Sequence, residues 1–154
     1  MLTVHGDEND AIYSGLQEES VYLPEGGGIQ QIEGSGAPAP AAQTIEERIK
    51  AGSRTYTANC AACHQPDGQG IAGAFPPLAG SDYLLSDPNR SIQVVISGLS
   101  GEISVNGMTY NGVMPGVRLS DEEVANVLTY VLNSWGNDGG EVTPPQVNRA
   151  RLGH

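Results

Sequence analysis

The sequence has 154 residues, 38% of them hydrophobic, which suits one domain with a single core and flanking segments. Its formal net charge is −11, and the first 44 residues hold seven acidic side chains and no Lys or Arg. The lack of a basic patch argues against a nucleic-acid partner, because such binding depends on neutralising phosphates. No apolar run is long enough to span a membrane, and the N-terminus lacks the pattern of a secretory signal.

Two segments precede the region that can build a core. Residues 1–23 are acidic, mix polar with scattered apolar side chains, and show no sustained period. Residues 24–43 are rich in Gly, Pro and Ala, a composition typical of a linker. We therefore expect an extended N-terminal arm at 1–23, joined by a linker at 24–43 to a compact domain at 44–136.

Two capping signals predict helices in the first part of that domain. Thr44 followed by Glu47 is a capping box, and apolar residues then recur at three- and four-residue steps, which predicts a helix over 45–60. Asp87-Pro88 supplies an N-cap and a first-turn proline for a second helix over 88–98. Helices are thus expected on both sides of the central loops.

The second part of the domain reads as a small hairpin and a final helix. Apolar residues alternate around Asn106-Gly107, a dipeptide that favours a tight hairpin turn. Ser120 and Glu123 form another capping box before a continuous apolar stripe that Gly136 ends. The stripe consists of Val124, Val127, Leu128, Val131, Leu132 and Trp135. Residues 137–154 are expected to form a C-terminal tail.

The two cysteines of the sequence stand in Cys60-Ala61-Ala62-Cys63-His64. This spacing is the attachment pattern of c-type haem, in which two thiols bind the porphyrin and the adjacent histidine ligates iron. A thiol-disulfide centre or half of a zinc site also uses a Cys-x-x-Cys pair. The remaining histidines, His5 and His154, make a four-ligand zinc site a poor fit, and a preceding helix is untypical of a thioredoxin-like centre.

A haem that transfers electrons needs a sixth ligand, and a methionine thioether opposite histidine raises its reduction potential. Met1 lies beyond the predicted linker and is set aside. Met114 lies in the segment 111–116, whose Gly and Pro residues predict an irregular loop near the cofactor. Met108 follows a tight turn, where a thioether is more often a packing residue. The sequence therefore favours Met114 as the axial ligand.

The segment Phe75-Pro76-Pro77-Leu78 is expected to form a rigid turn against the cofactor. We expect Pro76 and Leu78 to line the pocket, with the Pro76 carbonyl accepting the proton on the second ring nitrogen of His64. A plain proline turn is the alternative. Three aromatic residues on the apolar faces of the first and last helices should pack those helices together: Tyr56, Tyr130 and Trp135.

From Thr44 to Gly136 the chain resembles class I cytochromes c. The residues that carry this resemblance are Gly52, Tyr56, Cys60, Cys63, His64, Pro76, Leu78, Met114, Pro115, Tyr130 and Trp135. The resemblance implies an all-α fold with crossed N- and C-terminal helices around one covalent haem c. It also implies covalent attachment by Cys60 and Cys63 and axial ligation by His64 and Met114.

The flanks carry a narrower resemblance. GDENDAIYSGLQEESVYLPEGG, the linker, CAACHQPDGQGIAGAFPPLAGSDYL and TYVLNSWGN are similar to the C-terminal part of haem-fused copper nitrite reductases. This implies a tethered periplasmic donor of single electrons, not an enzyme on its own, in a polypeptide that carries out denitrification. Its acceptor would be the cupredoxin domains and its donor an upstream cytochrome or cupredoxin. The alternative is a free periplasmic shuttle, or a cytochrome subunit of another respiratory complex.

Overall fold

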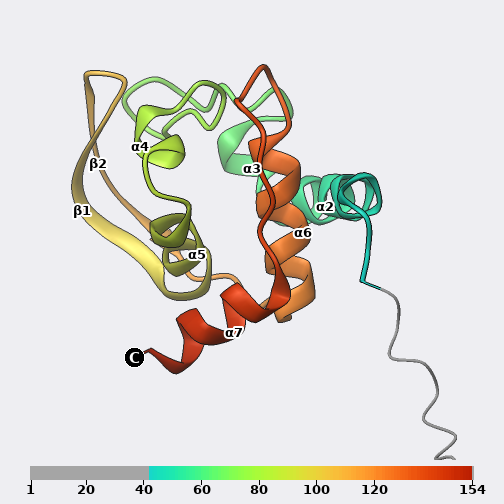
Figure 1. Cartoon of the computed structure of the whole chain (residues 1–154). Helices are drawn as coiled ribbons and strands as arrows, with labels where there is room; N and C mark the ends of the chain where they lie inside the picture. Colours follow the sequence, from blue (N-terminus) through green and yellow to red (C-terminus); the bar gives the residue numbers. More distant parts are fainter. Residues whose placement is uncertain (1–41, 154) are drawn as a thin grey trace, which may run out of the picture. The chain divides into compact units, whose positions relative to one another are not determined.

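Helices make up most of the regular structure in the computed structural model, which describes residues 42–153. The predicted arm at 1–23 lies outside these residues, as does the predicted linker except for its last two positions. Figure 1 shows the order of the elements. They are α2 Ile45–Asn59, α3 Ala61–His64, α4 Asp82–Leu85, α5 Pro88–Ser97, β1 Gly98–Val105, β2 Met108–Pro115, α6 Asp121–Leu132 and α7 Pro144–Leu152. The predicted all-α class with one small hairpin is confirmed.

Helix α2 begins where the capping box predicted. The Thr44 hydroxyl accepts from the Glu47 backbone N–H at 3.2 Å, and the Glu47 carboxylate accepts from the Thr44 N–H at 2.9 Å. The helix buries Gly52 and Tyr56 and crosses α6, with which it makes its most extensive packing (Figure 1). The crossed terminal helices expected from the sequence are therefore present.

Helix α6 supplies the centre of the hydrophobic core. Its side chains from Val124 to Leu132 are nearly all buried, and Ser120 and Glu123 form the predicted capping box. The helix ends at Leu132, so Trp135 lies in the following turn with a positive φ of 53°. The predicted helix, which continued through Trp135, was therefore too long. The Trp135 ring still packs against the core.

The hairpin is longer than the sequence suggested. Asn106 and Gly107 form its turn with φ of 51° and 78°, and the antiparallel register runs from Val105↔Met108 to Gly98↔Pro115. Met114 therefore lies on β2, paired with Leu99, and the expectation of an irregular loop was wrong. A β-carbon on Gly98 would lie 2.5 Å from the Met114 carbonyl oxygen, so glycine is what lets the two strands meet there.

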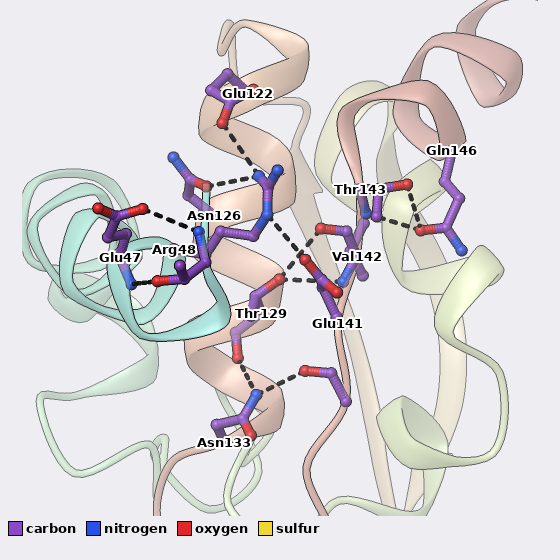
Figure 2. A network of polar contacts seen from close by, with 12 residues as sticks. Glu47, Arg48, Glu122, Asn126, Thr129, Asn133, Glu141, Val142, Thr143 and Gln146 are labelled. Carbon is purple, nitrogen blue, oxygen red and sulfur yellow. Dashed lines mark hydrogen bonds and ion pairs between the residues drawn. The ribbon is translucent and has the colours of Figure 1, made fainter. Parts of the chain in front are cut away.

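Residues 137–154, expected to be a tail, contain helix α7 packed against α5 and α6. Val142 and Val147, both within this segment, are buried. Thr129 of α6 holds the segment in place, because its hydroxyl donates to the Val142 carbonyl and accepts from the Val142 N–H, as Figure 2 shows. Few apolar residues mark the segment in the sequence, and its order depends on these contacts with α6.

A buried arginine joins α2, α6 and the start of the C-terminal segment. Arg48 is 4% exposed and contacts Glu122 at 3.1 Å, Glu141 at 3.0 Å and the Asn126 side-chain oxygen at 3.0 Å (Figure 2). All three partners accept hydrogen bonds from its guanidinium, so the buried charge is compensated. Arg48 thereby stabilises the helix crossing at the end opposite the cysteine motif.

Candidate cofactor site

The cysteine motif lies at the junction of α2 and α3. Cys60 is the C-cap of α2 and the N-cap of α3, and its carbonyl accepts from the N–H groups of Cys63 at 3.2 Å and His64 at 3.0 Å. Cys63 is exposed, Cys60 is half-buried and His64 is 7% exposed. This single turn presents two free thiols and directs the imidazole into the protein.

The imidazole of His64 is held by the predicted partner. Its Nδ1 lies 2.9 Å from the Pro76 carbonyl oxygen. A carbonyl only accepts hydrogen bonds, so Nδ1 carries the proton and Nε2 keeps its lone pair. Burial lowers the pKa of His64, and the bond to Pro76 opposes that shift. A neutral, oriented imidazole is the form that binds a metal.

Two glycines shape the loop that carries Pro76. The Gly70 N–H donates to the His64 carbonyl at 2.9 Å, and a β-carbon on Gly70 would lie 2.2 Å from the Phe75 carbonyl oxygen. The Gly68 carbonyl accepts from the N–H groups of Leu78 at 2.7 Å and Ala79 at 3.0 Å. Sequence analysis overlooked Gly68 and Gly70; their positions between the cysteine motif and the proline pair were the available signal.

The three predicted aromatic residues form a cluster beside the histidine. The ring centroid of Tyr56 lies 5.5 Å from that of Tyr130 and 5.1 Å from that of Trp135. The Tyr56 hydroxyl donates to the Gln65 carbonyl at 2.7 Å, and burial raises the pKa of Tyr56, which keeps it a neutral donor. Gly68 lies against Trp135 with no space for a β-carbon. The cluster packs α2 against α6, as predicted, and also supports the loop after His64.

Two adjoining cavities open beside His64, and both are also lined by Pro76 and Met114. The first extends between α5, α6 and the hairpin, and its walls are almost entirely apolar. Its further lining residues include Tyr56, Leu78, Leu84, Val95, Val127, Leu128 and Val131. The second reaches the surface near Cys63, Phe75 and Val113. The cysteine motif, Met114 and the proline turn thus lie around these two adjoining cavities, with Cys60 at the first and Cys63 at the second.

The structure separates the two methionine candidates. Met114 is half-buried and faces the same cavities as His64. Met108 is 45% exposed, and neither of the two cavities includes it among its lining residues. Met1 lies outside the described residues. Within residues 42–153, Met114 is therefore the methionine that lines the same cavities as His64.

The two alternative uses of the cysteines find little support. Among the described residues, no group of three or more His, Cys, Asp or Glu side chains is arranged to hold a metal ion. Burial, followed by the influence of Cys63, raises the pKa of the Cys60 thiol to about 11. A reactive redox cysteine requires a lowered thiol pKa, so thiol-disulfide chemistry is disfavoured at this position.

Comparison with known proteins finds a family match for residues 49–135. The matching family model is that of cytochrome c. Cytochrome c-552 of Thermus thermophilus is 50% identical over 91 residues, covering 56% of this chain and 69% of that protein. The cytochrome c subunit of the quinone alcohol dehydrogenase of Gluconobacter oxydans is 32% identical over 133 residues, covering 84% of this chain and 27% of the subunit.

A third relative is the cytochrome c subunit of gluconate 2-dehydrogenase from Pantoea cypripedii, 36% identical over 92 residues. The match covers 56% of this chain and 20% of that subunit. The chain therefore spans most of a small relative and only a fraction of the larger dehydrogenase subunits. In the part of the chain that the structure describes, no helix is long and apolar enough to cross a membrane.

Proposed function

This chain belongs to the cytochrome c family, and we propose, from the resemblance of its flanking segments, that it delivers single electrons to the copper domains of a nitrite reductase in the periplasm. Members of the family carry covalently bound haem c, and Cys60 and Cys63 occupy its attachment motif. A cytochrome c domain is an electron carrier and not itself catalytic. The observation that carries the electron-transfer role is the apolar cavity shared by His64 and Met114.

The residues present fit a haem. Apolar side chains line the first cavity, as a porphyrin requires. The Arg90 guanidinium lies over the Tyr83 ring, 3.7 Å from its centroid; Tyr83 lines this cavity, whereas Arg90 itself lines a different one. Arg90 Nε is buried without a hydrogen-bond partner among the described residues. The carboxylate side chains of haem are acceptors of the kind that such an orphaned donor lacks.

Four side chains are proposed to hold the cofactor. Cys60 and Cys63 would attach it covalently, and His64 Nε2 and the Met114 thioether would ligate its iron, with Pro76 and Leu78 in the pocket wall. When bound, the haem supplies a one-electron iron couple whose potential a thioether ligand raises. The chain's own part is to fix the His64 ring through Pro76, to exclude water with apolar walls, and to block external ligands with Met114.

The nitrite reductase assignment is supported by the resemblance of residues 1–23, the linker and the TYVLNSWGN segment. A tether of this kind keeps the haem near its acceptor, so that each transfer does not wait for a diffusional encounter. On this proposal an upstream cytochrome or cupredoxin supplies the electrons. The arm itself lies outside the described residues.

A second candidate is a cytochrome that serves a dehydrogenase or moves freely between complexes. The observation that favours it is the match of 84% of this chain to the alcohol dehydrogenase cytochrome subunit of Gluconobacter oxydans. That match extends beyond the region shared with the small cytochrome c-552, which covers 56% of this chain. Both candidates use the same haem site and differ in the partner.

Stopped-flow mixing of the reduced protein with oxidised copper nitrite reductase domains tests the proposal. We expect the rate of copper reduction to match the rate of haem oxidation. We also expect transfer to be faster when residues 1–43 join the haem domain to the copper domains in one chain. A variant lacking residues 1–43 is the matched control, because the described helices remain intact in it. Transfer to the copper domains no faster than to an unrelated acceptor, together with rapid reduction by a quinone alcohol dehydrogenase, would favour the second candidate.

A further inference from the structure

We propose that Asn137 is a positioning residue for the haem ligand His64 and acts through the backbone of residues 76–80. The inference rests on the proposed ligation by His64. Asn137 follows the last residue matched by the family model, which ends at residue 135, and it precedes the C-terminal helix α7. Its role follows from the contacts of its side chain.

The Asn137 amide bridges two parts of the fold. Its Nδ2 donates to the Val131 carbonyl of α6 at 2.8 Å and to the Leu78 carbonyl at 3.1 Å. Its Oδ1 accepts from the Gly80 N–H at 2.7 Å. The side chain thus uses both donor hydrogens and its acceptor on backbone groups, which fixes the amide in one orientation. It clamps the segment after the proline pair onto the C-terminal end of α6.

This clamp matters because the proline pair cannot anchor itself. Pro76 and Pro77 have no backbone N–H, so neither can donate a hydrogen bond. The nearest following donors are those of Leu78 and Ala79, which bind the Gly68 carbonyl, and that of Gly80, which binds Asn137. Gly68 and Asn137 therefore hold the segment from its two sides. The Pro76 carbonyl, 2.9 Å from His64 Nδ1, is positioned by these neighbours.

The consequence concerns the electronic character of the ligand. A firm hydrogen bond from Nδ1–H makes the imidazole a stronger donor, which stabilises the oxidised metal and lowers the reduction potential. Loosening the segment weakens that bond and should raise the potential. Asn137 would in this way link the end of α6 and the C-terminal segment to the haem site.

The chain offers a matched control in Asn133. Its Nδ2 donates to the Thr129 carbonyl at 2.8 Å and the Gly140 carbonyl at 2.6 Å, so it also clamps the end of α6. Those contacts hold the C-terminal segment and do not involve residues 76–80. Asn133→Ala and Asn137→Ala are both neutral truncations of an amide with backbone partners. They differ in whether the anchored backbone leads to Pro76.

The experiment compares both variants in the haem-loaded, full-length protein. We expect Asn137→Ala to accelerate solvent exchange of the His64 Nδ1 proton about tenfold by NMR, since its bonds to residues 76–80 are lost. Its reduction potential should rise. Asn137→Ser, which replaces the amide with a single hydroxyl and tests a milder change, should give an intermediate exchange rate. Asn133→Ala should lower the unfolding midpoint while leaving the proton exchange and potential near those of the parent protein.

Any one of the following results would overturn the proposal. If Asn137→Ala lowers only the unfolding midpoint, or if Asn133→Ala changes exchange and potential equally, the clamp is merely structural. If the parent protein in its ferric state shows no paramagnetically shifted His64 resonances, His64 is not the ligand, and the proposed site fails together with this inference. Normal His64 resonances with an unaffected Asn137→Ala variant would reject the inference alone.

Discussion

The backbones of α2 and α6 touch where Gly52 lies against Asn126. A β-carbon on Gly52 would lie 2.0 Å from the Asn126 carbonyl oxygen and 2.7 Å from the β-carbon of Tyr130. The contact brings the helix axes close together and sets their crossing. Tyr56 and Cys60 follow on the same side of α2, so this close approach also places the cysteine motif relative to α6.

Gly52→Ala should therefore destabilise the fold, although alanine favours a helix by about 1 kcal/mol. The added methyl group meets rigid backbone, and overpacking of this kind costs typically 1–3 kcal/mol or more, so we expect a net loss of about 2 kcal/mol. Urea unfolding measures it. Lys50→Ala, an exposed substitution on the same helix, should stay within about 0.5 kcal/mol. Equal effects of the two substitutions would contradict the close approach.

Met114→Ala should lower the reduction potential and open the iron to external ligands, because the proposed thioether ligand is lost. Met108→Ala should leave both nearly unchanged, since its side chain is outside the cavities. Potentiometry and carbon monoxide binding to the reduced protein provide the measurements. The ligand assignment is wrong if the two variants behave the other way round.

Cys60→Ala should reduce covalent haem retention, because one of the two thioether bonds cannot form. Denaturing gels stained for haem measure how much cofactor remains attached. His64, in the same motif, would still be available as an iron ligand in this variant, so the gel reports the loss of the covalent bond alone. Full retention of covalent haem in this variant would be incompatible with attachment through both cysteines.

Arg48→Met should cost about 2–3 kcal/mol of unfolding free energy. The buried Asn126 oxygen loses its donor, while Glu122 and Glu141 keep partial contact with water, which limits the penalty. Arg151→Met provides the comparison, because its ion pair with Asp121 is more exposed and should contribute about 1 kcal/mol or less. Similar losses in both variants would show that burial of Arg48 has no special effect.

Val147→Ala should destabilise the protein by roughly 1–2 kcal/mol, because it removes two methyl groups from a side chain that is 0% exposed. Leu152→Ala, at a position 76% exposed on the same helix, should change stability by less than about 0.5 kcal/mol. Chemical unfolding of both variants tests whether α7 belongs to the core. If Val147→Ala left the unfolding free energy unchanged, the C-terminal segment would contribute little to the core.

Acid should weaken the attachment of α7 through Asp121. The hydrogen bond from Arg151 is the main cause that lowers the pKa of this carboxyl below its ordinary value. A carboxyl with a lowered folded-state pKa stabilises the fold above its unfolded pKa of about 3.9, and this contribution is lost as pH falls further. Asp121→Asn should therefore show a smaller loss of unfolding midpoint between pH 7 and pH 3 than the parent. Parallel pH profiles would rule out this role.

Features encoded by neighbouring residues were predictable from the sequence. The capping boxes of α2 and α6, the Asn106-Gly107 turn and the cysteine motif each act within a few residues, so local geometry follows from the residue types. The bond from His64 to Pro76 was also anticipated, since a rigid proline turn after the motif suggested an acceptor. These features predicted the fold class and the cofactor.

Features that depend on distant residues were decided only by the tertiary structure. Met114 lies on a strand because Leu99 pairs with it, and α7 is ordered because Thr129 and Arg48 hold the segment before it. Asn137 has no motif of its own, and its importance appears only when α6 and residues 76–80 are brought together. The physical reason is that such contacts form between surfaces created by folding, which no local pattern of residues encodes.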